Sequence, residues 1–499
     1  MAHSAPLDDI VLPTGRRTSG LLLHPTSLPG PYGIGDLGAA VYQFVDFLVA
    51  SGQQCWQVLP LGPPDTVYSP YQGASSIAGN TLLLSLDTLV ADGWLPQTAL
   101  DTAPTFPADF VDYGAVIPWK EALLRNTAAT CVQALSGSER LAFEAFCADK
   151  HAWLDDFARF MALKEANDRR AWTQWTNPTD CDPVTVQAYK FLQFQFFRQW
   201  QALKQYCHAR GVCLFGDVPL YVAHDSADVW GHPELFTLDD TGQPTIVAGV
   251  PPDYFSAVGQ RWGNPLYRWD VIADTGYAWW VARIRAVLEL VDVVRLDHFR
   301  GFEHYYAIPA DAPDARHGTW IKGPGDGWFA ALHQALGSLP LIAEDLGTIT
   351  PEVLALRDRW HLPGMRVLQF AFGSDAPDDP HKPHNYVQNC VVYTGTHDND
   401  TALGWFAQLG TAERTRALRY LHSDGQAMHW DMIRAALASV ADTAIVPVQD
   451  VLGLGTTARM NLPGTSHRNW SWRLQPGQLH TSLSERLLEL TCTYGRQRP

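Results

Sequence analysis

Three acidic residues of this chain follow short apolar runs, either directly or within a few residues. The pairs are residues 291–296 with Asp297, residues 341–343 with Glu344 and residues 391–393 with Asp398. Strands of a parallel sheet that is buried on both faces read as short apolar runs, and side chains leave the core just past their carboxyl ends. We therefore expect the three acids to share one pocket. An acid after a strand is also a common helix cap or turn residue, so each acid alone is weak evidence for catalysis.

Such a pocket would suit chemistry at a glycosidic bond. That reaction uses two carboxyl groups, one ionised and one protonated, and a third acid can bind hydroxyls of the distorted sugar ring. Arg295 lies two residues before Asp297 and therefore points to the same side of its strand. A guanidinium there favours the ionised carboxylate that a nucleophile requires. Arg295 could also serve in a buried salt bridge or contact the substrate, and these roles are compatible.

The elements that position these acids predict a (β/α)₈ barrel. Eight short apolar runs lie at residues 20–23, 55–59, 212–218, 291–296, 341–344, 365–370, 390–393 and 444–448. Helical patterns between them include residues 39–51, 277–290, 327–336, 351–360 and 412–421. Eight strands alternating with helices are typical of such a barrel. An open, doubly wound sheet is the alternative, but it would lead us to expect a glycine-rich phosphate loop after the first strand, and none is present.

We expect residues 1–499 to form one catalytic barrel with two long insertions. Residues 62–182, after the second strand, predict a mainly helical inserted subdomain, because far more chain lies there than one crossover needs. Residues 219–274, after the third strand, are rich in Gly, Pro and aromatic residues and predict substrate-binding loops. The helix that returns to the barrel shows an apolar face that we interpret as core: Phe196, Trp200, Leu203 and Cys207.

The composition excludes several classes of partner. A net charge of −16 argues against nucleic acid or an anionic membrane surface, both of which attract basic patches. The chain shows no apolar stretch of the length of a signal peptide or a membrane span, so we expect a soluble, cytosolic protein. Its eight cysteines include no Cys-x-x-Cys pair and are interpreted as buried thiols.

At residues 295–299 (Arg-Leu-Asp-His-Phe), 343–347 (Ala-Glu-Asp-Leu-Gly) and 395–399 (Gly-Thr-His-Asp-Asn), the sequence resembles the amylomaltases. These are 4-α-glucanotransferases, also called disproportionating enzymes, and relatives of the α-amylases. The resemblance extends to residues 28–37, 69–72, 216–221, 249–256, 260–265 and 459–464. It covers essentially the whole chain, although residues 97–189 offer no matching motif.

The resemblance implies a role for each matching residue. Asp297 is the expected nucleophile, Glu344 the general acid/base and Asp398 the acid that binds ring hydroxyls. Asp217 is expected to orient Arg295, with direct sugar contact as the second possibility. The remaining expected substrate-binding residues are Arg295, His298, His397, Tyr71, Asp253, Tyr254, Phe255, Gln260, Trp262 and Asn461.

Aromatic residues in Gly/Pro-rich loops support a sugar ligand independently, because glucose presents apolar C–H faces that stack on flat rings. Tyr71, Tyr254, Phe255 and Trp262 are such residues. Packing of the loop onto the barrel is the other explanation. We further expect residues 249–256 to cover a bound glucan and restrict the access of water.

The sequence therefore predicts a retaining 4-α-glucanotransferase that acts on maltooligosaccharides and amylose without cofactor or metal, as a monomer or weak homodimer. An α-glucan hydrolase is a close alternative, disfavoured because only about 50 residues follow the eighth strand. A non-catalytic carbohydrate-binding scaffold would need the aromatic residues but no aligned acids. A metal-dependent barrel hydrolase could use Asp297, His298, His397, Asp398 and Asp400 as ligands, but it lacks a His-x-His pair on an early strand.

Overall fold

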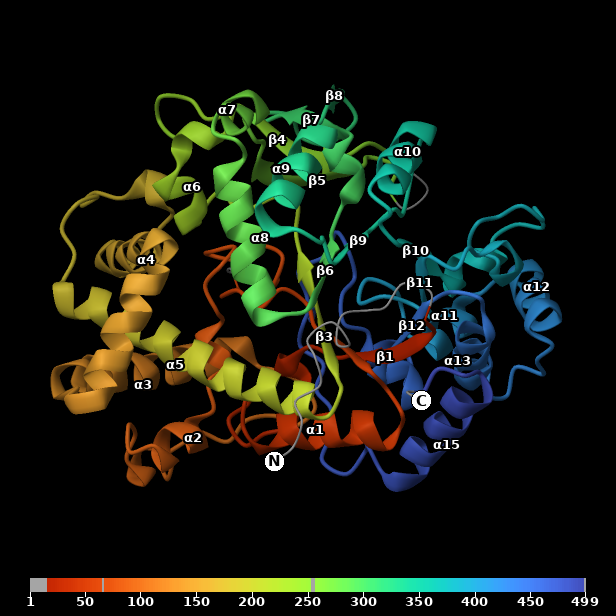
Figure 1. Cartoon of the computed structure of the whole chain (residues 1–499), viewed down its shortest axis with the longest axis horizontal. Helices are drawn as coiled ribbons and strands as arrows, with labels where there is room; N and C mark the ends of the chain where they lie inside the picture. The colour runs from red at the N-terminus through yellow and green to blue at the C-terminus, as the bar shows by residue number, and fades with distance from the viewer. Residues whose placement is uncertain (1–15, 65–66, 253–255, 498–499) are drawn as a thin grey trace.

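The computed structural model describes residues 16–64, 67–252 and 256–497, and a parallel eight-stranded sheet lies at its centre (Figure 1). Its strands are β1 (Thr18–Leu22), β2 (Cys55–Gln57), β3 (Cys213–Val218), β6 (Val293–Leu296), β9 (Leu341–Ala343), β10 (Gly364–Val367), β11 (Cys390–Tyr393) and β12 (Thr443–Pro447). Each lies in one of the eight predicted runs or overlaps it. The predicted (β/α)₈ barrel is therefore confirmed.

The order of the strands shows where the barrel closes. Neighbours pair in the order β10-β11-β12-β1-β2-β3-β6-β9, and all these pairs are parallel. β9 and β10 are the two ends of this order, and the amide of Ala343 donates to the carbonyl of Pro363 (2.8 Å) where they meet. We call this junction the seam of the barrel.

Helices cover the outside of the sheet with their apolar faces. α1 (Ala39–Ala50) buries Val41, Phe44, Val45 and Leu48, which follow the spacing of one helical face. The other surrounding helices include α8 (Ala278–Leu290), α9 (Asp326–Leu336), α10 (Pro351–Arg359), α12 (Thr411–Leu421), α13 (Met428–Ala438) and α15 (Thr481–Thr493). The helix patterns predicted from the sequence are present.

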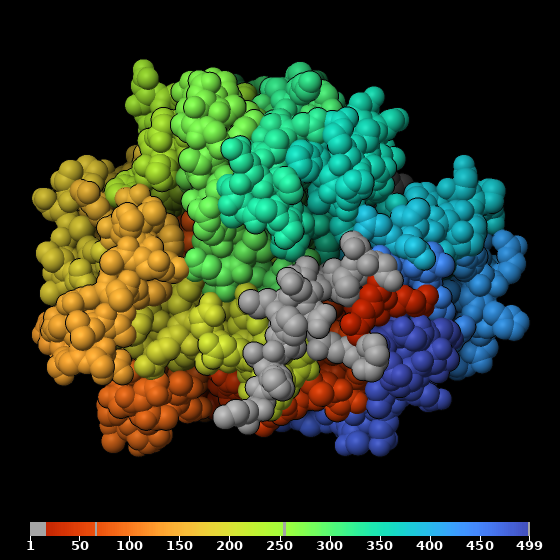
Figure 2. Space-filling view, in the orientation of Figure 1, coloured from red at the N-terminus to blue at the C-terminus, as the bar shows by residue number. Residues whose placement is uncertain are grey.

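The chain between β2 and β3 is largely helical. It contains α2 (Leu86–Ala91), α3 (Tyr113–Ala134), α4 (Gly137–Ala166) and α5 (Pro183–Ala209), and α3 and α4 both pack on α5. The side chain of Asp182 caps α5 by accepting from the amides of Val184 and Thr185. Phe196, Trp200, Leu203 and Cys207 are all buried, which confirms the predicted core face. In Figure 2 this helical region and the C-terminal helices lie at opposite sides of the face shown.

A second sheet, which the sequence did not predict, lies beside the barrel (Figure 1). It is antiparallel, with the order β5-β4-β7-β8. β4 (Ile246–Val250) and β5 (Gln260–Pro265) precede β6, whereas β7 (His304–Pro309) and β8 (Thr319–Lys322) follow it. Residues 219–274, expected to be loops, thus also contain α6 (Ala227–Gly231), α7 (Trp269–Asp274) and two strands.

The cysteines are free thiols, as predicted, but they are not all buried. Cys55, Cys131, Cys207, Cys213 and Cys390 are buried, Cys147 and Cys181 are partly exposed, and Cys492 is exposed. The prediction of a buried thiol is therefore wrong for Cys492, which lies at the outer side of the last turn of α15. Among the described residues, no helix combines the length and apolar character needed to span a membrane.

Candidate active site

The carboxyl ends of β6, β9 and β11 bring the predicted acids to one end of the barrel. Asp297 directly follows β6 and Glu344 directly follows β9, two strands that pair with each other. The amide of His298 donates to Glu344 Oε2 (2.9 Å), which connects the two strand ends. Asp398 comes from the loop after β11. The structure therefore places all three acids after the carboxyl ends of strands of the barrel sheet.

Arg295 links two acids at this end of the barrel. Its Nη1 lies 2.6 Å from Asp217 Oδ2, and its Nη2 lies 2.7 Å from Asp297 Oδ1. Burial lowers the pKa of Arg295, but the charges of Asp217 and Asp297 raise it by more, so the pKa lies well above its ordinary value. The guanidinium therefore remains charged and forms ion pairs with both acids.

Asp217 is more deeply buried than Asp297 and also accepts a hydrogen bond from the hydroxyl of Tyr71 (2.8 Å). Burial raises the pKa of Asp217, an effect opposed by Arg295. The side chain of Asp217 is fully inaccessible, whereas that of Asp297 is 28% exposed. A ligand in the barrel mouth can therefore reach Asp297, and Asp217 is placed to hold Arg295.

Glu344 is enclosed between two backbone segments. Its Oε2 accepts from the amide of His298, and its Oε1 accepts from the amide of Leu346 (3.2 Å). Burial raises its pKa well above the ordinary value; Arg295 opposes this shift, and Asp297 and Asp345 add to it. An acid with a raised pKa can hold a proton near neutral pH, as a general acid must.

Asp398 is held mainly by neutral groups. Asn461 Nδ2 donates to Asp398 Oδ1 (2.6 Å), and Arg459 Nη2 donates to the carbonyl of Asp398 (2.5 Å). His397 Nε2 lies 3.4 Å from the same Oδ1. The side chain of Asp398 is 43% exposed, so it remains accessible to a ligand.

Both predicted histidines lie at the barrel mouth, and both contact aromatic rings. His397 stacks on Tyr71 with ring centroids 5.1 Å apart, and His298 meets Trp262 edge to face at 4.9 Å. Burial lowers the pKa of His298 to about 4 and also lowers that of His397. Both rings are therefore neutral at pH 7. Nε2 of His298 has no hydrogen-bond partner among the described residues and can pair with a ligand hydroxyl.

The second sheet supplies two further predicted residues. Gln260 and Trp262 lie two positions apart on β5, and Trp262 Nε1 donates to Gln260 Oε1 (3.1 Å). The ring contact between Trp262 and His298 therefore connects the second sheet to the loop after β6. Asp253, Tyr254 and Phe255 lie outside the described residues.

Three residues near the site were not predicted. Tyr221 lies 6.2 Å from His298 between ring centroids, and Trp470 lies 5.8 Å from both Tyr71 and His397. His24, which follows β1, is buried, and its pKa is lowered mainly by burial. Tyr221 stands in a motif already noted, residues 216–221, which could have identified it. Trp470 had no local signal.

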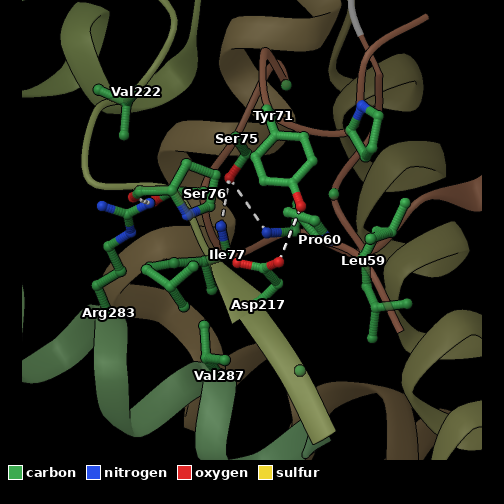
Figure 3. Close-up of a pocket in the computed structure, with 18 of the residues that line it drawn as sticks. Leu59, Pro60, Tyr71, Ser75, Ser76, Ile77, Asp217, Val222, Arg283 and Val287 are labelled. Atoms are coloured by element: carbon green, nitrogen blue, oxygen red, sulfur yellow. Dashed lines mark hydrogen bonds between the residues drawn. The ribbon is translucent and has the colours of Figure 1, made fainter. Parts of the chain in front are cut away.

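Two pockets flank the acids. One, with an empty volume of about 640 Å³, lies between the ends of β2 and β3 and helix α8, where Tyr71 points at Asp217 and Arg283 and Val287 line the other wall (Figure 3). The other, about 430 Å³, is lined by His24, His397 and Arg459, among other residues. Neither is lined by Asp297 or Glu344. The pockets therefore adjoin the acids and do not enclose them.

The part of the chain that the structure describes contains no group of three His, Cys, Asp or Glu side chains arranged to hold a metal ion. Asp297 instead pairs with Arg295, and Asp398 with Asn461. The arrangement offers one carboxylate beside a guanidinium, one enclosed acid with a raised pKa, and one accessible acid. Such a set can perform acid/base-assisted substitution at a sugar.

Known proteins show the same chain organisation. A family model described as 4-alpha-glucanotransferase matches residues 23–480. The 4-alpha-glucanotransferase of Synechocystis sp. is 48% identical over 498 residues, covering 97% of this chain and 98% of that protein. The enzyme of that name from Thermus thermophilus is 48% identical over 491 residues, covering 94% and 97%. The structure of the amylomaltase from Streptococcus agalactiae in complex with acarbose has a TM-score of 0.93 and 35% identity, covering 97% of this chain and 100% of that one.

Proposed function

The chain belongs to the 4-alpha-glucanotransferase family, and from this membership we propose that it transfers 1,4-α-glucan segments between maltooligosaccharides or amylose by double displacement with retention. The observation that supports this mechanism best is the contrast between two adjacent acids. Asp297 forms an ion pair with Arg295, whereas Glu344 is enclosed and has a raised pKa. A retaining mechanism needs one carboxylate nucleophile and one proton donor.

In the first half-reaction, a carboxylate oxygen of Asp297 attacks the anomeric carbon of the donor glucan. Glu344 gives its proton to the departing 4-oxygen, so the glycosidic bond breaks as the ester to Asp297 forms. Arg295 remains charged throughout and orients the nucleophile. The product is a covalent glycosyl-enzyme and a shortened glucan with a free 4-hydroxyl.

In the second half-reaction, the 4-hydroxyl of an acceptor glucan enters the position of the departed chain. Glu344, now ionised, removes the proton from this hydroxyl as the oxygen attacks the anomeric carbon. The ester bond to Asp297 breaks, and the glycosidic bond is formed again with net retention. Water in place of the acceptor would give hydrolysis.

The remaining residues of the site bind the sugar. Asp398 is accessible and can accept hydrogen bonds from ring hydroxyls, while the neutral rings of His298 and His397 can do the same or donate. Tyr71 and Trp262 provide aromatic faces and edges near these histidines. Asp217 acts through Arg295. The proposed roles of Gln260 and Asn461 are to fix Trp262 and Asp398.

Incubation with maltotriose alone tests the activity. A transferase yields glucose together with maltopentaose and longer chains, whereas a hydrolase yields only glucose and maltose. Chromatographic separation by chain length reads out the result, and the Asp297→Asn variant serves as the inactive control. Absence of products longer than maltotriose would contradict the proposal. The cytosolic location and the monomeric or weakly dimeric state remain predictions.

A further inference from the structure

The barrel seam lies directly beside Glu344. β9 pairs with β6, and β10 pairs with β11, so each of the two strands at the seam is hydrogen-bonded to a neighbouring strand on the side away from the seam. Glu344 is the first residue after β9, and its amide donates to the carbonyl of Leu296 (3.1 Å) on the β6 side. The position of Glu344 therefore depends on what holds the other side of its peptide, toward β10.

Asp345 provides that connection. Its Oδ1 accepts from the amide of Met365 in β10 (2.6 Å). Its Oδ2 pairs with Arg357 Nη1 of α10 (2.5 Å) and lies 3.5 Å from Arg366 Nη1 of β10. The side chain is only 1% exposed. A buried carboxylate thus joins β9, β10 and α10 at the residue next to Glu344.

The backbone of β10 leaves room for this carboxylate only because residue 364 is glycine. A Cβ at Gly364 would lie 2.6 Å from Asp345 Oδ2, 2.9 Å from Oδ1 and 2.8 Å from Arg357 Nη1. Such contacts are too short for any side chain, so a larger residue would displace the carboxylate. The ion pair fits closely against the glycine of the seam.

We propose that Asp345 is a positioning residue for the proposed general acid/base: it anchors the peptide after Glu344 to β10 and, with Arg357, sets the charge beside Glu344. This inference rests on the proposed function, because it assumes that Glu344 is the proton donor. Asp345 does not contact the substrate in this proposal. It acts through Glu344.

The charges around the two acids fix the expected direction of the effect. Arg295 from β6, Asp297 after β6 and Asp345 face Glu344, and Asp345 itself faces Arg357, Arg366 and His381. The negative charge of Asp345 disfavours ionisation of Glu344. Neutralising Asp345 therefore lowers the pKa of Glu344. Neutralising Arg357 leaves the negative charge of Asp345 less compensated and therefore raises the pKa of Glu344.

Two variants and a matched control test this with opposite signs. Asp345→Asn keeps an oxygen that can accept from Met365 but removes the charge, and Arg357→Gln removes the paired cation. Asp358→Asn is the control, because Asp358 also pairs with Arg357 but its side chain is 63% exposed. The measurement is kcat/KM for maltotriose against pH, since its alkaline limb reports the acid of the free enzyme. Thermal unfolding shows that each variant is folded.

We expect the alkaline limb of Asp345→Asn to move to lower pH by about half a unit and that of Arg357→Gln to move to higher pH by a similar amount. In Asp345→Asn, kcat should also fall about 10-fold with little change in KM, because the acid is misplaced only for the chemical step. Asp358→Asn should leave the limb in place. A purely structural role would lower activity in both variants without opposite shifts.

The proposal is overturned if the limbs of the two folded variants stay in place or move in the same direction. If Asp345→Asn does not fold, Arg357→Gln against Asp358→Asn decides, and an unshifted limb in Arg357→Gln overturns the proposal. The Glu344→Gln variant separates this outcome from failure of the proposed function. An active Glu344→Gln enzyme with an unchanged alkaline limb would contradict both the proposed role of Glu344 and that of Asp345. If Glu344→Gln is inactive but the limbs of the Asp345 and Arg357 variants do not shift, only the role of Asp345 is contradicted.

Discussion

The two sides of the barrel mouth hold their acids differently. On the β6 and β9 side, Asp297 is paired with a buried arginine and Glu344 is enclosed by backbone amides. On the β11 side, Asp398 is 43% exposed and its carboxylate is held by the amide of Asn461. The ion pair at Asp297 and the burial of Glu344 thus give two neighbouring acids different surroundings, and burial raises the pKa of Glu344. A neutral amide holds the third acid in place and leaves it open to the sugar.

The largest effect should follow removal of the charged oxygen on the β6 side. Asp297→Asn should lower kcat by roughly 10⁴-fold or more, because the covalent bond to the sugar can no longer form. Steady-state kinetics with maltotriose measures this, with circular dichroism as the check on folding. A folded variant that keeps more than about a tenth of the activity would assign the nucleophile elsewhere.

Glu344→Gln should lower kcat on maltotriose by about 10³-fold, because neither half-reaction then has its proton carrier. A donor with a fluoride leaving group needs no proton, so the variant should still form the glycosyl-enzyme. Mass spectrometry of the intact protein after reaction with α-glucosyl fluoride should show the added glucosyl mass on Asp297. The same treatment of Asp297→Asn is the control, and no adduct on Glu344→Gln would argue against the pairing of these two acids.

The β11 side should respond more mildly. Asn461→Ala removes the hydrogen bond to Asp398 but keeps the acid, so kcat/KM should fall about 10- to 100-fold, the range expected for a hydrogen bond to a charged group. Asn469→Ala is a matched control on the same segment, because the side chain of Asn469 bonds only within residues 462–469 among its described contacts. Equal losses in the two variants would mean that the loop, and not the contact with Asp398, matters.

The smallest effect concerns stability. The folded-state pKa of His298 is about 4, below its ordinary value, so the unfolded chain binds a proton between about pH 6.5 and pH 4 while the folded chain does not. The stability contribution of this residue is therefore present above pH 6.5 and is lost as the pH falls toward 4. Urea unfolding at pH 7 and pH 4.5 measures this. Between these two pH values the free energy of unfolding of His298→Gln should fall by about 1–3 kcal/mol less than that of the parent. Equal losses would show that His298 is not buried in its neutral form.

The barrel could be predicted because its strands are buried on both faces. Cys390, Val391, Val392 and Tyr393 of β11 are all inaccessible, which is why they form an unbroken apolar run in the sequence. The positions of Asp297 and Glu344 could be predicted for the same reason, since each directly follows such a run, whereas Asp398 lies five residues beyond its run. These signals are local and depend on the chain alone.

The second sheet could not be predicted from such signals. β8 is mostly exposed, and β5 includes Gly263 and Pro265 and is only partly buried, so neither forms an apolar run or an alternating pattern. Trp470 is a similar case within the site. Its amide donates to the carbonyl of Met460 (2.7 Å), and its carbonyl accepts from the hydroxyl of Tyr113 (2.9 Å), so its place depends on contacts between distant segments.

The antiparallel sheet also constrains how this molecule can change. Its β4 and β5 precede β6 in the sequence and its β7 and β8 follow it, yet Ala248 of β4 is in register with Ala307 of β7. Suppose that only β4 and β5, or only β7 and β8, were replaced by the corresponding residues of a relative. The new strands would not match the strands that remain, and Trp262 would move relative to His298. Recombination that preserves the barrel mouth must therefore exchange the residues from β4 to β8 as one continuous segment, which includes Asp297.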